Sequence, residues 1–272
     1  MSKRVAIITD AVEHLGPDLA KKLAQRNHNL VLGGASDELA GELRELGAQV
    51  EVVSEVKDGQ DLVRADAVPS LIARANSAFG GFNAAFIRPG AHVMGDMFAT
   101  TGEDMQAAFE GNMLSTFHAL NALVPALIEQ GKGGQVLICS SATAIKPYTG
   151  AYAYNATRAG AVMLLRTAAQ SAAPHGIAIN GIGTMFLNYP GFLDNTGCRD
   201  PEVLERTLGN IPLARLGEPE EPAHIAAAML DGESNYITGE FISCLLYTSP
   251  SPRDCGPDLV CRLLLEKGGG GG

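Results

Sequence analysis

The chain has 272 residues, of which 46% are hydrophobic and 18% are charged, and its formal net charge is −10 at pH 7. This length and composition are typical of one globular domain with a large buried core. Nucleic acids and anionic membranes are bound through clustered lysines and arginines, so the acidic balance argues against both and favours a small, uncharged partner. The N-terminus shows no signal peptide or membrane-spanning run, which predicts a cytoplasmic protein.

Short apolar segments rich in β-formers alternate with longer segments of helical periodicity. We expect strands over 4–9, 29–33, 48–54, 82–87, 135–139 and 177–182, and a last strand beginning within 239–243. We expect helices over 15–27, 36–46, 61–79, 101–130, 152–174 and 219–230. Nearly continuous apolar strands separated by helices predict a single-domain α/β fold with a doubly wound, Rossmann-like parallel sheet. Ligands of such sheets bind beyond the carboxyl ends of the strands.

The segment from Cys244 onward breaks this pattern. It has no periodicity and ends in five glycines. Residues 244–254 resemble one reading frame of a sequencing-library transposase adapter, and residues 258–267 resemble the flow-cell adapter that follows it. We therefore expect residues 1–243 to form the catalytic domain and residues 244–272 to be a non-native, disordered tail. A genuine glycine-rich linker is the alternative.

Residues suited to proton transfer follow the strand predicted over 135–139. Ser141 lies just beyond this strand, and Tyr154 and Arg158 are four residues apart on the next helix, so their side chains project side by side. A permanent guanidinium charge beside a phenol favours the phenolate, which makes Tyr154 a candidate general base. Ser141 is a candidate to hold a substrate oxygen. A polar helix start with one surface arginine would give the same spacing.

This arrangement resembles the short-chain dehydrogenase/reductase superfamily, in which a serine thirteen residues before a tyrosine and a lysine four residues after it perform the acid–base step. Asn112 matches the helix asparagine of the superfamily's catalytic tetrad, and residues 212–221 and 236–239 resemble its later segments. The resemblance covers about residues 1–243. It implies a homotetramer built on the helices predicted over 101–130 and 152–174.

Four segments at which this superfamily contacts its nicotinamide cofactor are altered here. The Thr-Gly-x-x-x-Gly-x-Gly motif reads Thr-Asp-Ala-Val-Glu-His-Leu-Gly over 9–16, so that Asp10 and Glu13 add negative charge near a pyrophosphate and the His14 ring fills space reserved for glycine. The other altered segments are 33–35, 87–90 and 184–187. The resemblance, with these departures, implies that the chain uses no cofactor.

A serine, tyrosine and arginine without a dinucleotide motif is similar to the halohydrin dehalogenase branch of the superfamily. Residues 9–16 resemble its Thr-x4-(Phe/Tyr)-x-Gly motif, with His14 at the aromatic position, and residues 186–192 resemble its halide-site loop. The resemblance implies a cofactor-independent carbon–halogen lyase that converts vicinal halohydrins into epoxides and opens epoxides with small anions in reverse. It implies that Ser141, Tyr154 and Arg158 are catalytic and that the halide and substrate are lined by His14, Phe186, Leu187, Tyr189 and Phe192.

Two other functions stay open. The first is an NAD(P)-dependent short-chain oxidoreductase in which Arg158 replaces the catalytic lysine, and the four altered segments speak against it. The second is a catalytically silent relative that acts as a binding or regulatory protein. The retention of Ser141, Tyr154 and Asn112 together speaks against that function.

Overall fold

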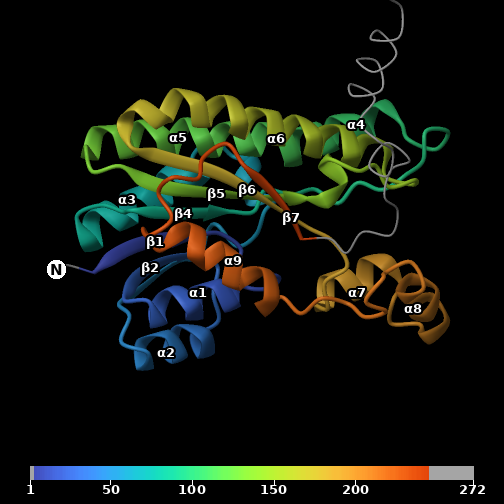
Figure 1. Cartoon of the computed structure of the whole chain (residues 1–272), viewed down its shortest axis with the longest axis horizontal. Coiled ribbons are helices and arrows are strands. Elements are labelled where there is room, and N and C mark those ends of the chain that lie inside the picture. The colour runs from blue at the N-terminus through green and yellow to red at the C-terminus, as the bar shows by residue number, and fades with distance from the viewer. Residues whose placement is uncertain (1–2, 245–272) are drawn as a thin grey trace, which may run out of the picture.

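A parallel sheet between two layers of helices makes up the described part of the chain. The computed structural model describes residues 3–244 (Figure 1). Within them the sheet has seven strands in the order β3-β2-β1-β4-β5-β6-β7, and all neighbours are parallel. The strands are β1 Arg4–Ile8, β2 His28–Gly33, β3 Val50–Val53, β4 Ala84–Ile87, β5 Gly134–Ser141, β6 Ile177–Thr184 and β7 Phe241–Cys244. This order confirms the predicted doubly wound α/β fold, and its switch point lies between β1 and β4.

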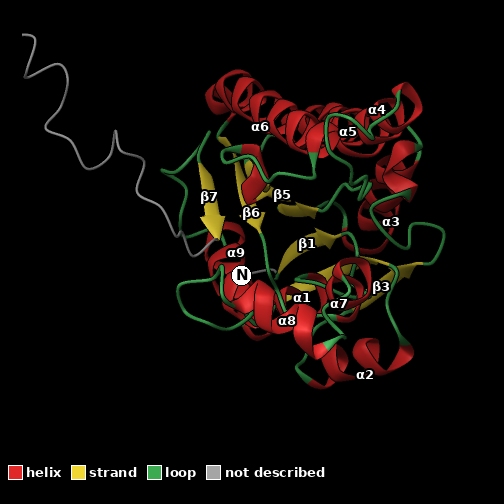
Figure 2. Ribbon diagram, turned by 90° about the vertical axis from the view of Figure 1, so that its right-hand side faces the viewer, coloured by secondary structure: helices red, strands yellow, loops and turns green. Residues whose placement is uncertain are grey.

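Helices cover both faces of this sheet (Figures 1 and 2). The helices packed on one face are α3 Ala67–Phe79, α5 Ser115–Gln130 and α6 Tyr152–Ala172. Those on the other face are α1 Gly16–Gln25, α2 Asp37–Glu45 and α9 Glu220–Leu230. In β1, Ile7 joins the first core while Ala6 and Ile8 join the second. Successive side chains of a strand point to opposite faces, so a strand covered on both faces is apolar throughout and can be recognised from sequence.

The helix predicted over 101–130 is divided in the structure. It begins as α4 Gly102–Ala108, passes through a π-helical segment over Phe109–Leu114, and continues as α5. A π-helical turn holds more residues than an α-helical turn and changes the direction in which the following side chains point. The segment carries Asn112, which is completely buried.

The chain beyond β6 forms two short helices that the sequence pattern did not predict. They are α7 Pro190–Thr196 and α8 Pro201–Leu208, and both have a proline in the first turn. Both lie beyond the carboxyl edge of the sheet (Figure 1). The predicted tail 244–272 falls outside the described residues, apart from Cys244 at the end of β7. Among residues 3–244, no helix combines the length and apolar character needed to cross a membrane.

Candidate active site

The carboxyl edge of the sheet brings the three predicted catalytic residues to one place. Ser141 is the last residue of β5, and Tyr154 and Arg158 occupy successive turns at the start of α6. Ser141 and Arg158 are buried, at 5% and 7% exposure, whereas Tyr154 is half-buried. The structure therefore places a partly exposed phenol next to two buried polar residues.

Arg158 lies over the face of the Tyr154 ring. Its Cζ atom is 4.9 Å from the ring centroid, which is cation–π geometry. Its Nη1 donates hydrogen bonds to the carbonyl oxygens of Pro89, at 2.9 Å, and Cys139, at 3.5 Å. These backbone acceptors hold a permanent positive charge beside the phenol, as the four-residue spacing predicted.

The hydroxyl of Ser141 is held by the turn that follows β5. Its Oγ accepts hydrogen bonds from the backbone N–H and the hydroxyl of Thr143, at 3.2 and 3.0 Å. The serine can still donate its own proton, which suits it to bind a substrate oxygen.

Asn112 ties three segments together. Its Oδ1 accepts from the Ala91 N–H at 3.1 Å, and its Nδ2 donates to the Ala91 carbonyl at 3.3 Å and to the Thr157 hydroxyl at 3.0 Å. These bonds join the loop after β4 to the first turns of α6. The contacts of Asn112 are therefore with the scaffold that carries Tyr154 and Arg158.

His14 reaches across the crevice from the turn after β1. Its Nε2 lies 3.0 Å from the hydroxyl of Thr184 at the end of β6, and its ring meets Tyr189 edge to face at 5.0 Å. Burial, with added effects of Arg88 and Arg158, lowers the pKa of His14 well below its usual value, so the imidazole is neutral at pH 7. Within residues 3–244, Nδ1 of this ring has no hydrogen-bond partner.

A buried ion pair between Arg88 and Asp10 lies beside His14. Burial is the largest single effect on Arg88 and would lower its pKa, but the charge of Asp10, its hydrogen bond and the nearby Tyr189 and Cys139 together raise it. Asp10 was predicted to add negative charge to the first turn. In the structure its carboxylate is paired with Arg88, from the loop after β4.

The loop after β6 gathers most of the predicted lining residues. Phe186 lies 6.2 Å from Phe192, and Tyr189 lies 6.3 Å from Phe192, between ring centroids. Arg88 donates to the Tyr189 hydroxyl at 3.4 Å. Leu187 is the exception, since it is buried in the core under α9. His14, Phe186, Tyr189 and Phe192 thus form one cluster.

His92 was missed by the sequence reasoning. Its imidazole meets the Tyr154 ring edge to face, with centroids 5.6 Å apart and planes at 71°. Its position in the sequence could have identified it. His92 follows β4, and the fold places ligands beyond the carboxyl ends of its strands.

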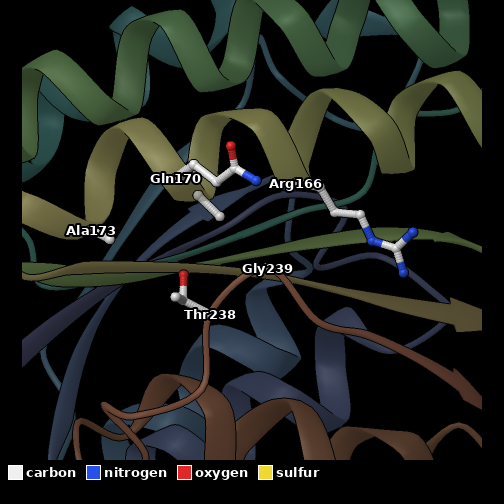
Figure 3. A pocket seen from close by; sticks show the side chains of 6 residues that line it. Arg166, Gln170, Ala173, Thr238 and Gly239 are labelled. Carbon is white, nitrogen blue, oxygen red and sulfur yellow. The ribbon is translucent and has the colours of Figure 1, made fainter.

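A cavity lies away from the aromatic cluster of His14, Phe186, Tyr189 and Phe192. It has a volume of about 370 Å³ and lies between α6 and the segment that precedes β7 (Figure 3). Its lining residues are Arg166, Ala169, Gln170, Ala173, Thr238 and Gly239. Arg166 is eight residues beyond Arg158 on α6, so this cavity is separate from the crevice at Tyr154.

The comparisons with known proteins show the family. A family model described as enoyl-(acyl carrier protein) reductase matches residues 12–244. The chain therefore belongs to this family of the short-chain dehydrogenase/reductase superfamily.

Curated relatives and solved structures agree with this assignment. The chain is 29% identical over 245 residues to oxidoreductase UcpA of Salmonella typhimurium, covering 88% of this chain and 92% of the relative. It is 28% identical to 2,5-dichloro-2,5-cyclohexadiene-1,4-diol dehydrogenase LinX of Sphingobium indicum, covering 88% and 93%. It is 25% identical to 3-oxoacyl-(acyl-carrier-protein) reductase FabG of Staphylococcus aureus, covering 87% and 94%. The fold matches levodione reductase with a TM-score of 0.79 at 22% identity, covering 89% of this chain and 96% of that one.

These relatives correct the predicted enzyme class. The expectation of a cofactor-independent halohydrin dehalogenase, a carbon–halogen lyase, is wrong, because the relatives are an oxidoreductase, a dehydrogenase and a reductase. A solved xylitol dehydrogenase with bound NAD⁺ shares the fold, with a TM-score of 0.78 at 22% identity, covering 90% of this chain and 98% of that one. That prediction rested on the resemblance of two short segments, 9–16 and 186–192, to the dehalogenase branch. The similarity to oxidoreductases extends over most of the chain.

The family implies a nicotinamide dinucleotide, and the first turn of this chain carries side chains that would weaken the binding of its pyrophosphate. Asp10 and His14 stand at glycine positions of the motif and have left-handed backbone, with φ of 55° and 58°, but carry side chains. The His14 contact with Thr184 spans the crevice from β1 to β6. Gly16 alone keeps its role, because a Cβ there would lie 1.9 Å from the Asp10 carbonyl oxygen.

Proposed function

We propose that the chain is a short-chain oxidoreductase that acts on the hydroxyl or carbonyl group of a small, uncharged molecule. The observation that carries this proposal is the position of Arg158 over the ring of Tyr154 at the start of α6, with Ser141 at the end of β5. The family and the names of the relatives support the reaction class.

Tyr154 exchanges a proton with the substrate oxygen in this proposal. Arg158 holds a permanent positive charge over the phenol ring, and the Pro89 and Cys139 carbonyls keep that charge in place. Ser141 donates a hydrogen bond to the same substrate oxygen and orients it. General acid–base catalysis of this kind contributes about 10²–10⁴ in rate.

The substrate side of the crevice is formed by the aromatic cluster. His14, Phe186, Tyr189 and Phe192 offer half-buried or buried rings, and Arg88 is neutralised by Asp10. Such a lining favours an uncharged substrate with apolar groups next to the reacting oxygen. Leu187 contributes to the core under this lining and not to its surface.

The test is turnover of a panel of secondary alcohols with NAD⁺ or NADP⁺, and of the matching ketones with the reduced forms, followed by nicotinamide absorbance. We expect turnover in the native chain and its loss by about a hundredfold or more in Tyr154→Phe. Release of halide from 1,3-dichloro-2-propanol with no dinucleotide present, lost in the same variant, would overturn the proposal.

A further inference from the structure

Tyr154 needs a route by which its proton reaches the solvent. In the proposed reaction it gains or loses one proton in each turnover, so the phenol has to be reset before the next. Arg158 cannot perform this step, because a guanidinium has no acceptor atom and stays protonated in proteins. Asn112 has both amide N–H groups engaged, by Ala91 and by Thr157. Ser141 is directed toward the substrate oxygen.

The His92 ring is the neighbour of Tyr154 on the solvent side. The two rings are in edge-to-face contact at 5.6 Å, and His92 is exposed while Tyr154 is half-buried. A neutral imidazole has one nitrogen that accepts and one that donates, so it can take up a proton at the first and release one from the second. Proton exchange of the exposed ring with water then restores the original tautomer.

The loop that carries His92 is firmly held despite its exposure. Both backbone groups of Ala91 bond to Asn112, and the Pro89 carbonyl accepts from Arg158. The loop also packs closely on the π-helical segment, since a Cβ on Gly111 would lie 2.3 Å from the Cβ of Ala91. The contact between His92 and Tyr154 is therefore built into the scaffold.

The surroundings of His92 keep its ring in the neutral form. Burial, followed by the charges of Arg158 on α6 and Arg88 on its own loop, lowers the pKa of His92 below its usual value. The imidazole is thus neutral at pH 7, and Tyr154 is the titratable group in ring contact with it.

We propose that His92 relays the proton between Tyr154 and the solvent. When the substrate is an alcohol, the O–H bond of Tyr154 breaks, an N–H bond forms at the unprotonated ring nitrogen, and the other ring nitrogen releases its proton to water. The steps reverse when the substrate is a carbonyl. His92 acts through Tyr154 and does not touch the substrate. This proposal rests on the proposed function only in needing Tyr154 as the acid–base group.

The decisive variant is His92→Phe, which keeps an aromatic ring against Tyr154 but cannot carry a proton. We expect kcat at pH 7 to fall by about tenfold or more with little change in KM, because water replaces only part of an acid–base group worth about 10²–10⁴. Added imidazole restores kcat, and the residual kcat rises with buffer concentration. The control is His175→Phe, an exposed histidine beyond the end of α6, with wild-type kcat and no response to imidazole.

The two proposals fail in different ways. If Tyr154→Phe is inactive but His92→Phe has wild-type kcat and no buffer dependence, the relay is wrong and the oxidoreductase proposal stands. If Tyr154→Phe keeps its activity, the oxidoreductase proposal itself fails.

A proton NMR titration tests the relay without any substrate. We expect the midpoint of the His92 titration to rise in Arg158→Gln, because that change removes a positive charge beside the ring. We also expect this midpoint to move in Tyr154→Phe, because the two rings are in contact. A His92 midpoint that responds to neither change would overturn the relay.

Discussion

At the scale of single residues, the unusual feature is the pair of side chains at Asp10 and His14. A residue other than glycine in the left-handed region costs about 1 kcal/mol or more and persists only where the surroundings hold it. Here the surroundings are the ion pair with Arg88 and the contacts with Thr184 and Tyr189. Together these contacts close the turn that opens toward the cofactor in dinucleotide-binding sheets.

Opening this turn should improve dinucleotide binding. In Asp10→Gly/His14→Gly both positions regain the residue that suits their backbone, the crevice is freed of the imidazole, and Arg88 becomes available to the pyrophosphate. We expect NADH or NADPH to bind at least about tenfold more tightly than to the native chain, a gain of about 1.4 kcal/mol. Fluorescence titration measures the affinity. Val12→Gly, in the same turn and exposed, is the control, and equal affinities in the two variants would refute the expectation.

His14 should make stability depend on pH. Its pKa is lowered in the folded state, so the unfolded chain binds the proton more readily and stability is lost as pH falls through the unfolded value of about 6.5. We expect the free energy of unfolding to drop by about 1.4 kcal/mol more in the native chain than in His14→Phe between pH 7.5 and 5.5. Urea denaturation at both values measures this. His175→Phe should behave like the native chain, and identical pH profiles for all three proteins would contradict the prediction.

At the scale of elements, the π-helical segment between α4 and α5 positions the site. It turns Asn112 toward Ala91 and Thr157, and through them it aligns the loop after β4 with the start of α6. The loop can come this close because Gly111 has no side chain where Ala91 packs. The segment is therefore linked by the hydrogen bonds of Asn112 to the turn of α6 that carries Arg158 and to the loop that carries His92.

Gly111→Ala tests this packing. The new methyl would lie 2.3 Å from the Cβ of Ala91, so the loop has to move. We expect a loss of about 1–3 kcal/mol in the free energy of unfolding, together with a lower kcat, because Arg158 loses its fixed acceptor at Pro89. Denaturation and turnover are measured side by side. Gly102→Ala, at the start of α4 with nothing within 4 Å of the new carbon, is the matched control, and equal stability of both variants would count against the argument.

At the scale of the whole molecule, α5 and α6 leave apolar side chains uncovered. Phe117 on α5 is 45% exposed and Met163 on α6 is 59% exposed. Exposed apolar side chains on neighbouring helices suit an interface between subunits. This arrangement supports the proposal of a homotetramer built on these helices.

Phe117→Glu should break that assembly. Burying a carboxylate in an apolar interface is unfavourable, so we expect a smaller species than in the native protein. Light scattering after size-exclusion chromatography measures the mass. The control is Leu46→Glu, which changes an exposed leucine just beyond α2 on the other side of the sheet. A native protein that is monomeric, or a Phe117→Glu variant of unchanged mass, would rule the interface out.

The stability of the catalytic domain should not depend on residues 245–272. Within residues 3–244 the edge strand β7 pairs with β6 from Phe241 to Cys244 and is the last of the seven strands. We propose that the following segment is a non-native tail, and we expect its deletion to change the melting temperature by less than about 2 °C. A fall of more than about 4 °C, worth on the order of 1–2 kcal/mol, would mean that the segment packs on the domain.

Local patterns determined the architecture and part of the site. Continuous apolar runs identified the strands because both faces of the sheet are covered, and the spacing of Tyr154 and Arg158 predicted their contact because residues four apart share a helix face. The π-helical segment and the short helices α7 and α8 were not predicted, since tertiary packing and not periodicity selects them. The reaction class was decided by the relationship of the whole chain and not by its divergent segments.

The remaining contacts were decided by the tertiary structure alone. His14 meets Thr184 across 170 residues, and Arg88 meets Asp10 across 78. His92 reaches Tyr154 from a different element. Each of these pairs lies at the carboxyl edge of a sheet in which the order of the strands is not their order in the chain. Sequence periodicity reports which face of an element is buried, but only the strand order and the register of the loops bring two such side chains together.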